Sequence, residues 1–203
     1  AHSLHNLADT ERIVGRLEDA RQHALESLKL YQELDYVLGV GMAMGNLGRI
    51  ALAAGDLPAA RRHLEEALRL RRQLGNRWGE SNSLKNLGAL SLLEGNLEEA
   101  RRQLCAAAEI AMADSSAPLL CEIMIICGRL LEAEGKAEAA LTITAAVLTQ
   151  PSAEVESRTA AQELQSKLMG QTGSSVVAMA LARGATLTLT EAAALALNAG
   201  AAK

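Results

Sequence analysis

A spacing of 40 residues repeats along this chain of 203 residues. Glycine recurs at that interval, and an alanine follows each glycine five places later: Gly15, Gly55, Gly95 and Gly135, with Ala20, Ala60, Ala100 and Ala140. A fixed period of this size is typical of stacked supersecondary units, which bury a continuous core only where neighbours cover one another. We therefore expect the function to lie in a surface that several units build together.

Each unit is predicted to be a helical hairpin that turns at its glycine. Apolar residues recur at helical intervals on both sides of the turn, and Gly48 and Gly88 would let helices approach closely. Asp56 and Asn96 are placed to cap the second helix, and Pro58 falls in its first turn, where a missing N–H costs little. The first helices are expected at about 36–53, 77–93 and 117–133, and the second at about 57–74, 97–113 and 137–149.

The spacing of asparagine, leucine, glycine and alanine resembles the tetratricopeptide repeat. The matching residues are Asn46-Leu47-Gly48, Gly55, Ala60 and Ala67, and in the next unit Asn86-Leu87-Gly88, Gly95, Ala100 and Ala107. Aliphatic side chains stand where the family usually has large aromatics, at Met44, Leu64, Leu84 and Leu104. The period also exceeds the usual length of about 34 residues. The resemblance implies an all-α, right-handed superhelix of four tetratricopeptide-like hairpins over residues 1–150.

Residues 151–203 are expected to form C-terminal capping helices, at about 153–169, up to about 183, and from 189. Thr188 and Glu191 have the spacing of a capping box. From residue 174 onward the charged side chains are Arg183, Glu191 and Lys203, so this segment should dock on the last hairpin or on a partner.

The segment 180–192 resembles the ending of large bacterial signalling proteins, in which a STAND-type ATPase and an output domain accompany a C-terminal tetratricopeptide array. That resemblance implies the sensor or scaffold end of a LuxR-type or cyclase-linked regulator, whose output chemistry lies outside these residues. The first unit also begins later in its first helix than the second and third do, so we expect further repeats before residue 1.

Composition narrows the classes of partner. The net charge of −4 argues against a general nucleic-acid surface, and no apolar run reaches the roughly 18 residues of a membrane span. No charged-then-apolar segment opens the chain, so a cytoplasmic location is expected, with no membrane and no direct nucleic-acid partner.

No motif for catalysis, a cofactor or a metal is present in the sequence. There is no phosphate-binding loop and no Ser/His/Asp or Cys/His arrangement, so we predict a non-enzyme without a cofactor. Cys105, Cys121 and Cys127 form no C-x-x-C pair near histidines and are expected to act as buried small hydrophobes, so no metal site is predicted.

The candidate binding residues lie on the first helices of the hairpins. Asn6, Asn46 and Asn86 share one place in the repeat, where an asparagine amide needs a hydrogen-bonding partner. In several tetratricopeptide proteins similar asparagines hold an extended peptide in the concave groove. The candidate groove set is therefore Asn6, Asn46, Arg49, Asn82, Lys85, Asn86 and Arg129. The alternative is that each asparagine bonds a neighbouring helix and fixes packing.

Two further features have competing interpretations. A basic series on the second helices includes Arg61, Arg69, Arg71, Arg72 and Arg101. It could form a phosphate-binding stripe, but it is interpreted as a solvated convex face paired with glutamates. Trp78 could be an exposed anchor for a partner, but it is interpreted as a core residue, because Leu38 occupies the same place one unit earlier.

These observations predict a protein- or peptide-binding module. The alternatives are a self-associating module, and a receptor for a short signal peptide or a small ligand in the groove.

Overall fold

The computed structural model describes residues 1–198, and every regular element in that range is an α-helix. The predicted all-α class is confirmed, and consecutive helices pack on one another as in a tetratricopeptide-like solenoid. The chain divides into two compact units, one of residues 1–94 and one that begins at Gly95.

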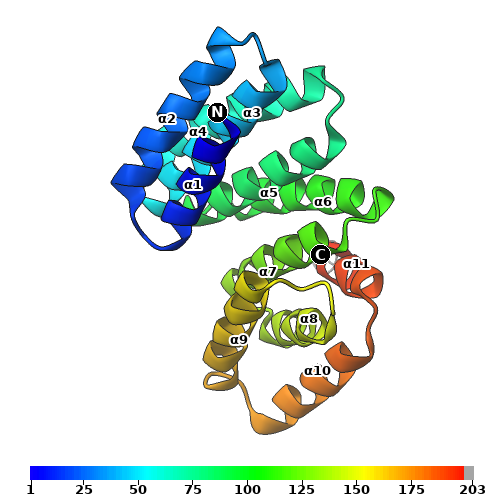
Figure 1. Ribbon diagram of the computed structural model, residues 1–203. Helices are drawn as coiled ribbons and strands as arrows, with labels where there is room; N and C mark the ends of the chain where they lie inside the picture. The colour runs from blue at the N-terminus through cyan, green and yellow to red at the C-terminus, as the bar shows by residue number, and fades with distance from the viewer. Residues whose placement is uncertain (199–203) are drawn as a thin grey trace. The chain divides into compact units, whose positions relative to one another are not determined.

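The first unit contains five helices, shown in blue to green in Figure 1. They are α1 (His2–Ile13), α2 (Leu17–Glu33), α3 (Val37–Ala53), α4 (Leu57–Gln73) and α5 (Arg77–Leu93). Each helix contacts the next, and α1 also contacts α3, as α3 contacts α5. These three first helices therefore lie in sequence along one face of the unit.

The second unit contains α6 (Leu97–Ala113), α7 (Ala117–Ala133), α8 (Ala137–Thr149), α9 (Val155–Met169), α10 (Ser174–Thr186) and α11 (Leu189–Asn198). Figure 1 shows α8 with α7, α9, α10 and α11 around it, and all four contact it. The expected helix boundaries agree with the observed ones to within a few residues. None of the helices in residues 1–198 is long and apolar enough to cross a bilayer.

The turns form as the sequence predicts. Gly55 and Gly95 have φ angles of 76° and 78°, in the left-handed region that costs a glycine little. Asp56 Oδ1 accepts a hydrogen bond from the Ala59 N–H at 3.0 Å, and Asn96 Oδ1 accepts one from the Glu99 N–H at 3.3 Å. Both predicted caps are confirmed, because each side chain satisfies a first-turn N–H that has no partner in its own helix.

Small residues set the distance between helices within a hairpin. A Cβ added to Gly48 would lie 2.6 Å from the Leu64 side chain, which is completely buried on α4. The alanines that follow the turn glycines, Ala20, Ala60, Ala100 and Ala140, are also completely buried. The absence of side-chain volume at these places is what lets the aliphatic side chains interdigitate.

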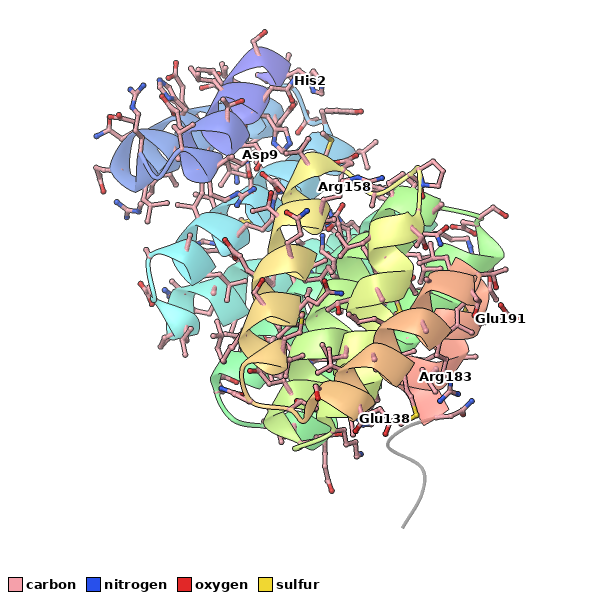
Figure 2. All side chains as sticks on the ribbon, turned by 90° about the horizontal axis from the view of Figure 1, so that it is seen from below. His2, Asp9, Glu138, Arg158, Arg183 and Glu191 are labelled. Atoms are coloured by element: carbon pink, nitrogen blue, oxygen red, sulfur yellow. The ribbon has the colours of Figure 1, made fainter. Side chains whose placement is uncertain are left out.

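Helices that follow α8 pack on α7 and α8. Arg158, near the start of α9 (Figure 2), donates to the carbonyl of Leu148 in α8 and to those of Gln150 and Ala153 in the connection between the two helices. Arg101 on α6 binds Glu134 through both carboxylate oxygens at 2.6 Å and donates to the Ala196 carbonyl of α11 at 3.1 Å.

The predicted capping box is confirmed at the start of α11. The Glu191 N–H donates to Thr188 Oγ1 at 3.2 Å, and Glu191 Oε2 accepts from the Thr188 N–H at 2.8 Å.

The closest packing in the cap lies between α10 and α8, and it can be tested at Gly184. A Cβ there would overlap the Thr142 carbonyl oxygen and lie 2.7 Å from Ala145 Cβ. Gly184→Ala should therefore destabilise the protein by about 1 to 3 kcal/mol, despite the better helix propensity of alanine. Gly173→Ala is the matched control, because no atom lies within 4 Å of its added Cβ. Urea unfolding would measure both variants, and equal midpoints would contradict the packing argument.

Candidate functional site

Most of the candidate residues lie in the first unit, on the first helices of its hairpins. We define the A-helix face as the surface of α1, α3 and α5. It holds Asn6 on α1, Asn46 and Arg49 on α3, and Asn82, Lys85 and Asn86 on α5. The remaining candidate, Arg129, is an exposed residue of α7 in the second unit.

Asn46 links α3 to α1. Its side chain is 1% exposed, and Nδ2 donates to the His5 carbonyl oxygen of α1 at 3.0 Å. Its Oδ1 accepts from Arg49 Nη2 at 2.9 Å. Both ends of the amide are therefore used inside the protein, which is the arrangement that the packing alternative describes.

The other asparagines have different surroundings. Asn6, at the same place on α1, is exposed. Asn82 is half-buried and Asn86 is 7% exposed, and Asn86 Nδ2 lies 3.5 Å from Asn82 Oδ1, the long limit of a hydrogen bond. Lys85 between them is 6% exposed. The α5 pair thus has amide donors and acceptors that its mutual contact satisfies poorly.

A charged cluster surrounds Asn46. Asp9 of α1, labelled in Figure 2, accepts from Arg12 at 3.0 Å and from Arg49 at 3.0 Å. Burial acts to raise the pKa of Asp9, but the guanidinium groups of Arg49 and Arg12 hold it below its usual value. Burial and the charge of Arg49 lower the pKa of His5, which favours its neutral form. In this cluster the Asp9 carboxylate forms ion pairs with two arginines, Arg12 and Arg49.

Arg71 extends from α4 between α3 and α5 and is 5% exposed. Its Nη1 donates to the Gly79 carbonyl at 3.0 Å and to Ser83 Oγ at 2.8 Å, both on α5. Its Nε is buried without a hydrogen-bond partner. Within residues 1–198 no carboxylate pairs with it. Burial, with a further contribution from Arg49, lowers its pKa to about 10, so the group still carries its charge at neutral pH.

The interpretation of Arg71 as part of a solvated face is wrong. Arg69 and Arg72 are exposed and pair with Glu66 and Glu80, as expected for a solvated surface. Arg71 instead continues the buried stripe of α4 formed by Ala60, Leu64 and Ala67, at steps of three and four residues. That helical spacing would have identified it, because a position in phase with buried residues is itself buried.

Two arginines of the basic series join successive repeats. Arg61 pairs with Glu94, and Arg101 pairs with Glu134, each 33 residues further along. Arg61 and Arg101 are therefore structural links as well as surface charges. The core interpretation of Trp78 is also wrong, because its side chain is 54% exposed while Leu38, at the equivalent place, is half-buried.

The cysteines give no reactive centre. Cys121 and Cys127 are buried as expected, Cys105 is half-buried, and burial raises the pKa of Cys127 to about 12. Over the described part of the chain, no three His, Cys, Asp or Glu residues are placed to hold a metal ion.

A hollow of about 440 Å³ lies in the second unit between α8, α10 and α11. Its polar lining includes Lys136, Arg183 and Glu138, of which the last two are labelled in Figure 2. The Nζ atom of Lys136 lies 2.8 Å from Glu134 Oε2. Because positive and negative side chains both line it, the hollow favours neither an anionic nor a cationic ligand, and it is left out of the candidate site.

Residues 1–73 match the family model for the tetratricopeptide repeat. This part of the chain is therefore similar to tetratricopeptide repeats. Tetratricopeptide repeats generally mediate contacts between proteins, which agrees with a polar face built from several helices. A search of curated proteins found no match to the chain.

The contribution of Asn46 to the stability of the first unit can be measured against Asn6. Asn46→Ala removes the side-chain donor to the His5 carbonyl and one of the acceptors of Arg49, so it should cost about 1 to 3 kcal/mol in unfolding free energy. Asn6→Ala changes the same place of the repeat at an exposed position and should stay within about 0.5 kcal/mol of the wild type. Urea unfolding of both variants is the measurement, and similar losses would show that the buried bonds contribute little.

Proposed function

We propose that this chain is a non-catalytic module that binds a protein or peptide partner on the A-helix face of its first unit. The supporting observation is the gathering of amide and guanidinium groups from α3, α4 and α5, of which α3 and α4 lie in the residues that match the tetratricopeptide model. Amide side chains can donate to and accept from an extended backbone, and such bonds give affinity without reading the sequence of the peptide.

Within this proposal the asparagines have separate roles. Asn46 holds α1 on α3 and so shapes the face. Asn82 and Asn86 contact a bound backbone, because their own contact at 3.5 Å leaves hydrogen-bonding capacity. Asn6, Arg49 and Lys85 are retained as candidate contacts of the partner, and Arg129, in the other unit, stays a separate prediction from the sequence.

A wider context is inferred from the segment 180–192. Its resemblance to the ends of bacterial STAND-type regulators supports a sensor or scaffold role in a larger, cytoplasmic signalling or transcriptional regulator. The sequence of the whole protein tests this, since an upstream phosphate-binding loop and an output domain are expected. A whole protein without either would contradict the regulator context and leave the binding role untouched.

Peptide binding can be tested without a known partner. A random twelve-residue peptide library displayed on phage should yield binders to the protein, and Asn82→Ala with Asn86→Ala should weaken the enriched peptides about tenfold, as expected for one or two lost hydrogen bonds. Gln22→Ala, an exposed amide on α2, is the control and should bind normally. A library that yields no binder, or equal affinity for both variants, would contradict the proposal.

Self-association is a second candidate, favoured by exposed apolar side chains at the turns between hairpins. Leu34, Leu74 and Trp78 are 69%, 46% and 54% exposed. If these turns join two copies, sedimentation equilibrium should show a mass that rises with concentration, and Trp78→Ser should reverse the rise. Val155→Ser is the control, because Val155 is 80% exposed in the other unit. A constant monomer mass would reject self-association.

A further inference from the structure

The charge of Arg71 has no counterpart in the fold. Its guanidinium is nearly buried, and within residues 1–198 its hydrogen bonds go to a neutral carbonyl and a neutral hydroxyl. Arg49 is its nearest charged influence and has the same sign. A buried charge without an opposite partner is costly, so an anion that reached this group would gain more than at a solvated surface arginine.

Glycines make the space that the guanidinium occupies. A Cβ on Gly45 would lie 2.8 Å from Nη2, and a Cβ on Gly79 would lie 2.8 Å from Cδ. Gly45 precedes Asn46 on α3, and Ser83, which accepts from Nη1, follows Asn82 on α5. The charged end of Arg71 therefore lies between the two helices that carry the candidate asparagines.

The repeat itself does not require an arginine at this place. The equivalent residues one period earlier and later are Tyr31 and Ala111, and both are buried. Tyr31 also packs on the equivalent glycine, Gly39, where an added Cβ would overlap its ring. Because an aromatic and a small side chain fill the same place in other repeats, packing explains the burial of Arg71 but not its charge.

We infer that Arg71 receives a carboxylate, the side chain of an Asp or Glu of a peptide bound on the A-helix face. This deepens the proposed function and rests on it. Nη2 is the guanidinium nitrogen left for a ligand, and its N–H groups can donate a charge-assisted hydrogen bond to a carboxylate oxygen. A carboxylate, with a single charge, fits the site better than a phosphate, because Nη1 is already engaged and Nε is buried.

The selected peptides provide the test. Binders from the twelve-residue library should share an acidic residue, and replacing it with Gln or Asn should weaken binding to the wild-type protein about tenfold. The same replacement should make no difference to Arg71→Met, and Arg71→Lys should bind the acidic peptide at an intermediate level. Arg72→Met, which removes an exposed charge paired with Glu80, should behave as the wild type. The replacement in the peptide needs no protein variant, so the test does not depend on whether Arg71→Met folds.

Each outcome separates this inference from the proposed function. Binders without a shared acidic residue, or an equal effect in Arg71→Met and Arg72→Met, would overturn the assignment of Arg71 and leave peptide binding established. A library without binders would overturn both. Displacement of the acidic peptide by inorganic phosphate, but not by acetate at the same ionic strength, would show that the site prefers phosphate and would overturn the carboxylate.

Discussion

The close approach of helices at glycine and alanine positions is the constraint on which the rest of this structure depends. Gly48 brings α3 so near to α4 that a methyl group would overlap Leu64. The chain has no Phe and only 1% aromatic residues, so large side chains cannot fill wide gaps between helices. Dense packing then requires short distances, and short distances require small residues at the contacts. The buried alanines that recur every 40 residues meet that requirement, whereas the glycines of the same spacing form the turns.

Local features were predictable because their causes are local. The helix boundaries follow from left-handed glycines and from caps such as Asp56 and Asn96, and each of these acts within about one helical turn. The box at Thr188 and Glu191 was readable for the same reason. The docking of the cap was predictable only as a class, since the carbonyls that Arg158 binds could not be identified from spacing.

The candidate site was only partly predictable, because equivalent places in a repeat have different neighbours. Asn46 is covered by α1 through His5, whereas Asn6, at the same place of the repeat, is exposed. Trp78 and Leu38 share a place in the repeat but not an exposure, since Trp78 is exposed and Leu38 is half-buried. Sequence register identifies equivalent positions, while the chemistry of each depends on the helix beside it.

Arg71 shows how the same constraint that builds the fold can produce a site. Gly45 and Gly79 belong to the set of small residues that lets α3, α4 and α5 pack, and the space they leave admits a long side chain from α4. The aromatic ring of Tyr31 fills the equivalent space in the preceding repeat, and Ala111, in the following repeat, has only a methyl group there. An arginine there adds a buried positive charge that the fold leaves uncompensated and that packing does not need. A feature that costs stability and is dispensable for packing is best explained by what it binds, and a guanidinium set between helices that carry amide side chains is suited to an acidic segment of a partner.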